Sequence, residues 1–224
     1  MRDIARSLLY ATLISTGGCV TPLTLQEQSP DLAYVVFEPI LVSIIDERHH
    51  KRKGIEPDIV GMEFHEFGLP RYMRVFPMLE VGFAKQHKTL IDLLEEPLVF
   101  GMNQSGWVAH PARFQAVPSN EEAAEALSTT NTGKFLSIVL YDWYVSVNKA
   151  LFSDSTFDWD LAVIIFSKGG NRILEWRTGA RTMIPFVASD SYPNTIKRAF
   201  RDRLDELVEA EQVREALLAT TEVQ

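Results

Sequence analysis

The sequence predicts one α+β domain, built on a single antiparallel or mixed β-sheet with helices packed on one face and a long C-terminal helix. Two observations lead to this fold class. Segments rich in β-branched and aromatic residues occur in runs, separated by amphipathic segments, rather than in strict strand–helix alternation. After residue 32 no linker-like stretch or internal repeat interrupts the chain. We therefore expect residues 33–224 to form one domain, preceded by a polar, proline-containing tether at 19–32.

The first part of this domain contains one clear strand and one clear helix. Residues 33–45 (AYVVFEPILVSII) have the composition of a strand, and Pro39 indicates an edge position or a bulge. In residues 86–96 (QHKTLIDLLEE) the leucines recur at helical spacing, and Pro97 is expected to stop the helix. Strands and loops are expected in residues 55–85, and short strands in residues 98–100 and 107–117.

The second part is more regular. Ser119 and Glu122 have the spacing of a capping box, which predicts a helix running to residue 127 or 128. Three strands follow, the last two joined in a hairpin through Gly169-Gly170. These strands are expected at residues 135–148, 157–167 and 172–183. Pro193 opens a final helix with apolar residues along one face, which continues to about residue 219.

The composition excludes several classes of protein. The 224 residues include 22 basic and 30 acidic side chains, for a formal net charge of −8. This balance argues against nucleic acid as a partner, because non-specific nucleic-acid binding depends on clustered lysine and arginine. The 46% of hydrophobic residues excludes wholesale disorder. A single cysteine excludes an intrachain disulfide framework and a metal site built from several cysteines.

Residues 1–18 have the parts of a secretory signal peptide. Arg2 and Arg6 make the start basic, residues 7–15 (SLLYATLIS) form an uncharged apolar run, and two glycines precede Cys19. The run is far shorter than the roughly 18 to 20 residues of a membrane-spanning helix. Two alternatives stay open: a cleaved signal without lipid, and an ordinary N-terminal helix with a buried cysteine.

The residues before Cys19 resemble the lipobox of bacterial lipoproteins. Gly17 and Gly18 occupy the two preceding positions, and Thr16 stands where leucine is usual. The resemblance implies that the cysteine thiol carries a diacylglyceryl group, that the signal is cut before it, and that the new N-terminus is acylated, for example with palmitate. Two or more acyl chains hold a protein on a membrane stably. Lipoproteins without Asp after the cysteine are usually sorted to the outer membrane, and Val20 implies that destination, facing the periplasm.

Three short motifs and the glycine pair of the hairpin carry a second resemblance. They are Ile45-Asp46-Glu47-Arg48, Tyr141-Asp142-Trp143, Asp158-Trp159-Asp160-Leu161 and Gly169-Gly170. With the lipobox and the C-terminal helix, this pattern resembles the YajG-like lipoproteins and, more loosely, lipoproteins related to the curli-secretion channel protein and to activators of penicillin-binding proteins. It covers residues 33–54 and 119–215, whereas residues 55–118 depart from it. The resemblance implies binding of an envelope protein partner and no common catalytic residues.

The densest polar cluster (DERHH) allows two interpretations. In one, His49 and His50 join His65 and nearby glutamates in a metal site, which needs three or four converging ligands. These histidines have no recognised metal-binding spacing, and His65 lacks the second histidine of a HExxH helix. In the other, the cluster is a solvated hairpin tip in which Asp46 pairs with Arg48. We expect the solvated tip, and no metal or cofactor.

Asp158 and Asp160 point to the same face of their strand, because side chains alternate along a strand. Two acids on one face suit acid–base catalysis in a glycosidase-like cleft. The alternative function is therefore a periplasmic hydrolase that uses either the metal cluster of His49, His50 and His65 or these two acids. On the other interpretation, they belong to a solvated sheet face and pair across strands with arginines. The candidates for such pairs are Arg172, Arg177 and Arg181.

Trp143, Trp159 and Trp176 fall on predicted sheet strands. Most such aromatics belong in a core, but several on the solvent face would form a partner-binding patch. Taken together, the sequence predicts a lipid-anchored, non-catalytic binding or assembly module of the bacterial envelope. A cytoplasmic protein with an uncleaved N-terminus is a further alternative.

Overall fold

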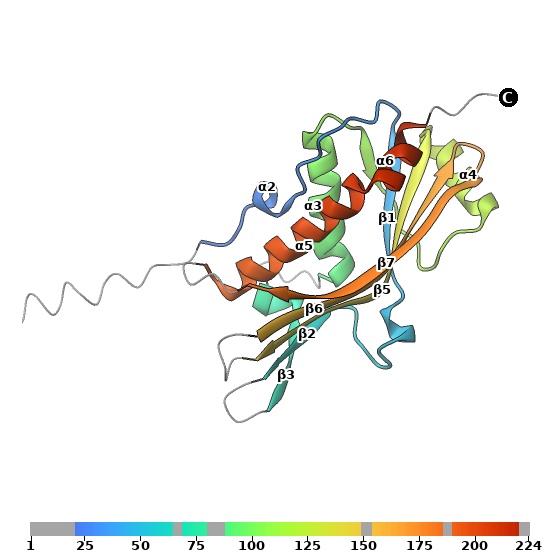
Figure 1. Ribbon diagram of the computed structural model, residues 1–224. Helices are drawn as coiled ribbons and strands as arrows, with labels where there is room; N and C mark the ends of the chain where they lie inside the picture. Colours follow the sequence, from blue (N-terminus) through green and yellow to red (C-terminus); the bar gives the residue numbers. More distant parts are fainter. Residues whose placement is uncertain (1–20, 65–68, 80–87, 149–153, 186–189, 220–224) are drawn as a thin grey trace, which may run out of the picture.

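The computed structural model describes residues 21–64, 69–79, 88–148, 154–185 and 190–219. One mixed, seven-stranded sheet forms its centre, with helices against both faces (Figure 1). The predicted α+β class and single sheet are confirmed. None of the described helices is long and apolar enough to cross a membrane.

Three long strands form the antiparallel meander that the sequence predicts. β5 (Lys134–Asn148), β6 (Asp154–Ser167) and β7 (Arg172–Ile184) pair in this order along most of their length. In the β6–β7 hairpin Gly170 has a φ of +77°, and a Cβ there would lie 2.1 Å from a backbone oxygen of the neighbouring helix. The turn requires glycine, which adopts positive φ without strain and permits the close approach.

β1 and β2 lie end to end along the other edge of β5. β1 (Ile40–Asp46) runs parallel to residues 134–140 of β5, and β2 (Ile59–Phe64) runs parallel to residues 145–148. Two short strands complete the sheet: β4 (Ala109–Pro111) beside β1, and β3 (Pro70–Arg74) beside β2. The chain that connects β1 to β2 includes the 3₁₀ turn η1 (Arg48–His50) and crosses the gap between the two strands.

The two faces of the sheet have separate hydrophobic clusters. The larger cluster lies under three helices: α3 (Leu90–Gln104), α5 (Tyr192–Glu209) and α6 (Glu211–Leu218). The smaller one lies under α4 (Asn120–Thr130), where Leu127 packs in one cluster with Phe135 and Phe166. α4 is the exception to the expectation that helices pack on one face, because this end of β5 and β6 is apolar on both faces.

Element ends near proline differ from the prediction. The strand expected at 33–45 begins only at residue 40, directly after Pro39. α3 begins at residue 90 and continues through Pro97 instead of stopping there, so residues 98–100 are helical and not a strand. Buried leucines on both sides of this proline offset the roughly 3 kcal/mol that an interior proline costs a helix.

The other elements follow the prediction more closely. The capping box at Ser119 is present, and its helix runs two residues further, to Thr130. The strand expected at 107–117 is reduced to the three residues of β4. The last helix is interrupted at Ala210, whose ψ of 133° is extended, and so becomes α5 and α6.

The segment expected as a tether is docked on the domain from Thr21 onward. The backbone N–H of Leu23 donates to Asn194 Oδ1 (3.3 Å), and Asn194 Nδ2 donates to the carbonyl of Thr21 (3.0 Å). Leu23 and Leu32 are buried. These leucines remove apolar surface from water, which explains why the segment packs on α5 rather than remaining free.

A short helix, α2 (Leu25–Gln28), lies within this docked segment and begins with a capping box at Thr24. The predicted signal peptide at residues 1–18 and the predicted lipidation site Cys19 lie outside the described residues.

Candidate functional site

A buried arginine fills the gap between β1 and β2. Arg48 is fully buried and pairs with Asp46 through two bonds of 2.8 Å. Its Nη1 also donates to the carbonyl oxygens of Ile59 (2.7 Å) and Trp143 (3.3 Å). The predicted Asp46–Arg48 pair is therefore present, but it is part of the interior and not of a solvated tip. The guanidinium satisfies a β5 carbonyl at the point where β1 has ended and β2 has not begun.

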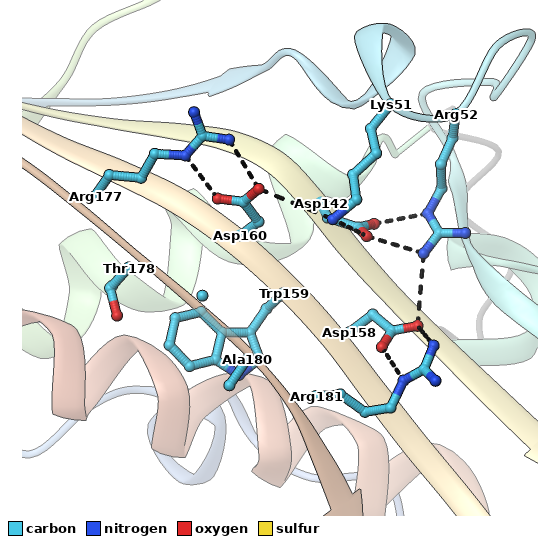
Figure 2. Close-up of a pocket in the computed structure, with 11 residues that line it drawn as sticks. Lys51, Arg52, Asp142, Asp158, Trp159, Asp160, Arg177, Thr178, Ala180 and Arg181 are labelled. Carbon is cyan, nitrogen blue, oxygen red and sulfur yellow. Dashed lines mark hydrogen bonds and ion pairs between the residues drawn. The ribbon is translucent and has the colours of Figure 1, made fainter.

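The Arg48 interaction fixes the charged connection above the sheet, beside a groove of about 660 Å³ (Figure 2). We call this the ion-pair groove. Four basic and three acidic side chains line it, and they come from the η1 connection, β5, β6 and β7. They are Lys51, Arg52, Asp142, Asp158, Asp160, Arg177 and Arg181.

Strand register explains why the three carboxylates meet. Asp142 of β5 lies directly opposite Asp160 of β6, and Asp158 follows two residues away on the same face. Asp158 lies opposite Arg181 of β7. The prediction that Asp158 and Asp160 share a face is confirmed.

Each carboxylate is held by a bidentate arginine. Arg52 binds Asp142 at 2.7 and 3.0 Å, Arg177 binds Asp160 at 2.9 and 2.8 Å, and Arg181 binds both oxygens of Asp158. Lys51 adds a contact of 3.0 Å to Asp142 and one of 3.9 Å to Asp160. Of the proposed arginines, Arg177 and Arg181 thus face the acids.

Arg172 does not face these acids and pairs with Glu175 instead (3.1 Å).

Two of the groove's arginines also stack on aromatic rings. The guanidinium carbon of Arg52 lies 3.8 Å from the ring centre of Tyr144, and that of Arg177 lies 4.2 Å from the ring centre of Tyr141. Stacking holds the planar guanidinium groups in place for bidentate recognition.

The electrostatics of the groove favour ion binding over acid catalysis. Hydrogen bonding from Arg181 lowers the pKa of Asp158, and hydrogen bonding from Arg177 lowers the pKa of Asp160. A general acid at neutral pH needs a raised carboxyl pKa, so this environment has the opposite effect. The residues that line the described groove include no histidine or cysteine.

Long, exposed basic side chains lie at the surface of the groove. Lys51, Arg177 and Arg181 are half or more exposed, whereas Asp142 is buried. The exposed cations can exchange a carboxylate of this chain for one of a ligand. The sequence motifs contain all three acids, but no local pattern marks Lys51 and Arg52 as site residues, because only the tertiary structure places their loop over β5.

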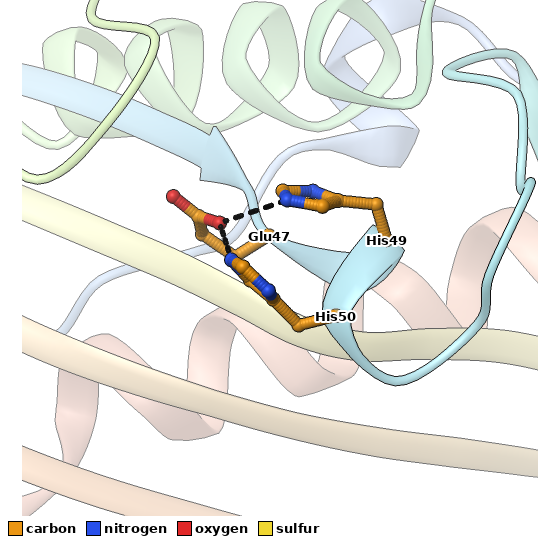
Figure 3. A group of neighbouring side chains, drawn as sticks. All are labelled: Glu47, His49 and His50. Atoms are coloured by element: carbon orange, nitrogen blue, oxygen red, sulfur yellow. Dashed lines mark ion pairs between the residues drawn. The ribbon is translucent and has the colours of Figure 1, made fainter.

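Glu47, His49 and His50 form a second polar cluster at η1 (Figure 3). Their ligand atoms lie within 4.8 Å of one another. Glu47 Oε2 is 2.8 Å from His50 Nε2 and 3.7 Å from His49 Nε2, and both rings are exposed. These three donors suit a divalent transition metal such as zinc, with a fourth position left for water or another ligand. His65, the third predicted histidine, lies outside the described residues.

The three tryptophans do not form an exposed patch. Trp143 and Trp159 are buried, and Trp176 is partly buried against the same core. The indole of Trp159 lies on the α5 side of the sheet, where Arg203 stacks on it at 4.2 Å. Odd-numbered β6 residues such as Trp159 pack in the cluster under α5, whereas the carboxylates of Asp158 and Asp160 lie in the groove, which Trp159 also borders.

Another hollow, of about 770 Å³, lies between α3 and β4. Val99 and Phe100 form apolar parts of its wall, and Arg113 lies there 2.7 Å from Asp92 and 3.0 Å from Glu95. Burial raises the pKa of Glu95.

Comparisons with known proteins give partial structural likenesses. No protein-family model matches the chain, and no curated protein sequence matches it. Protein XCC0632 from Xanthomonas campestris is 15% identical with a TM-score of 0.47, over 80% of this chain and 87% of that one. Lipoprotein GNA1162 from Neisseria meningitidis is 9% identical with a TM-score of 0.37, over 76% and 98%. The PelC dodecamer from Paraburkholderia phytofirmans is 10% identical with a TM-score of 0.39, over 86% and 95%.

Proposed function

We propose that this protein is a lipid-anchored, non-catalytic binding or assembly module of the bacterial envelope, held on the periplasmic side of the outer membrane. The observation that carries the proposal is the position of Cys19. It follows a signal-like segment and two glycines, and only Val20 separates it from Thr21, where the docked segment begins. We also propose that the protein is related to the YajG-like lipoproteins.

The ion-pair groove supplies the binding surface of this module. Exposed lysine and arginine side chains lie there among carboxylates, so a protein partner with complementary charges can exchange its own ion pairs for those within the groove. Such a surface gives specificity and rapid association more than affinity from apolar burial.

A hydrolase that uses Asp158 and Asp160 is the second candidate, favoured by the presence of both acids in one groove. Both carboxylates accept bidentate arginines and have lowered pKa values, so neither is prepared to donate a proton at neutral pH. We therefore favour binding.

The anchor is tested by expressing the full chain in a Gram-negative host and measuring the intact mass of the membrane-purified protein. We expect a chain that begins at Cys19 and carries three acyl chains. Cys19→Ser is expected to leave the membrane fraction, whereas the control Val20→Ala stays in it. A mature chain without lipid mass contradicts the anchor. Val20→Asp tests sorting, and it is expected to move the protein to the inner membrane.

The binding surface is tested by photo-crosslinking in intact cells. A crosslinking amino acid at position 51, in the groove, is expected to yield a discrete adduct that is lost when Arg177→Glu and Arg181→Glu are combined. The control position is Glu121, which is exposed on α4 and is not one of the residues that line the groove. Equal adducts from both positions, or an adduct that survives the charge reversal, contradict the proposed surface.

A further inference from the structure

We propose that one end of the sheet, the membrane-proximal end, rests on the lipid bilayer and that the opposite end points away from it. The membrane-proximal end is a single row of residues across five strands. By register it consists of Arg71, Glu63, Val147, Ser155 and Ile184. The inference rests on the proposed lipid anchor at Cys19 and adds the orientation of the domain.

The docked N-terminal segment reaches the same end. Asn194, in the first turn of α5, holds the backbone of both Thr21 and Leu23. Tyr192, two residues earlier, lies beside Ser155 of the row. It is also close enough to Glu63 for an electrostatic interaction with that side chain. The docking point therefore lies at the membrane-proximal end and not midway along the sheet (Figure 1).

The length of chain left over fixes the orientation. Only Val20 lies between Cys19 and Thr21, and two residues span at most about 7 Å when fully extended. Lipid on Cys19 thus holds the docking point within about 7 Å of the headgroups. A longer tether would allow either end of the domain to face the membrane. Because Thr21 and Leu23 are docked, the remaining chain is too short for this reorientation.

Side chains at this end suit contact with headgroups. Leu69 (68% exposed) directly precedes β3, and Tyr72 (54%) lies on it. Met183 (59%) lies at the end of β7. Tyrosine and apolar residues are favoured at a membrane interface. The opposite end also exposes apolar side chains, such as Phe37 and Ile173. Exposed apolar side chains therefore do not decide which end of the sheet contacts the membrane. The position of the lipid anchor decides it.

The test uses two positions on one strand. Met183 and Ile173 are both exposed on β7 and lie ten residues apart, about 33 Å along the strand. In the lipidated protein Cys19 is blocked, so a thiol introduced by Met183→Cys or Ile173→Cys is the only one that reacts with an environment-sensitive fluorophore. The labelled proteins are reconstituted in phosphatidylethanolamine–phosphatidylglycerol vesicles that contain nitroxide-headgroup lipid.

We expect the label at position 183 to lose most of its fluorescence to the nitroxide and the label at 173 to keep most of it. Leu69→Cys against Phe37→Cys repeats the comparison on other elements, in case either β7 variant fails to fold. Equal quenching of both labels, or stronger quenching at the opposite end, in protein that floats with the vesicles overturns the orientation and leaves the anchor standing. Protein that does not float with the vesicles contradicts the anchor, and the orientation falls with it.

Discussion

Replacing Arg48 by methionine is expected to destabilise the protein severely, because its guanidinium makes its contacts in the protein interior. The side chain is fully buried, and its guanidinium binds both oxygens of Asp46 and the carbonyls of Ile59 and Trp143. Methionine removes the charge and leaves the carboxylate and two carbonyls without this partner. The arginine at the end of β3, Arg74, pairs with Glu56 and Asp58 and provides the matched control for the same substitution.

Removing one member of a buried ion pair costs about 3–5 kcal/mol, whereas an exposed pair contributes about 0–1 kcal/mol. With a urea m-value of about 2–3 kcal/mol/M for a domain of this size, Arg48→Met is expected to lower the urea midpoint by about 1–2.5 M. Arg74→Met is expected to change it by a few tenths of that amount or less.

The assay is equilibrium urea unfolding of the unlipidated Cys19→Ser protein, followed by tryptophan fluorescence. A double-mutant cycle with Asp46→Leu isolates the pair itself, and the double variant is expected to be more stable than the sum of the two single losses predicts. Similar midpoints for Arg48→Met and Arg74→Met would refute the role assigned to the buried guanidinium.

Three further predictions use the same unfolding assay. Gly170→Ala is expected to cost more than about 1 kcal/mol through positive φ and the clash with α4, while Gly169→Ala, whose Cβ has no contact below 3.6 Å, changes little; equal effects would contradict the geometry of the turn. Ser119→Ala is expected to cost about 1 kcal/mol by removing the cap of α4, and an unchanged midpoint would count against that cap. Asp158 and Asp160 have folded pKa values below the ordinary 3.8, so their ion pairs stabilise the fold above about pH 4 and this stabilisation is lost as the pH falls through the lower folded values. The stability gap between the native protein and the double Asp→Asn variant should therefore be constant above about pH 4 and narrow as the pH is lowered further, and a gap that does not narrow would be evidence against the pairs.

The sequence predicts best where one local signal is strong. The capping box at Ser119 and the glycine turn at 169–170 each act within a few residues, and both are present. Pro97 shows the limit of local reasoning: its helix-breaking tendency is real, but leucines buried against the sheet outweigh it. The docking of Thr21 and Leu23 likewise depends on Asn194, more than 170 positions away.

The sequence by itself determined the fold class, the meander and the shared face of Asp158 and Asp160, because strand alternation and turn chemistry are short-range properties. Only the tertiary structure decided that Lys51 and Arg52 join Arg177 and Arg181 around these acids. Lys51 and Arg52 reach them because the connection after β1 crosses the gap above β5, where Arg48 is buried. Contacts between segments about 90 residues apart depend on how β1, β2 and β5 pack, and no local pattern encodes that packing.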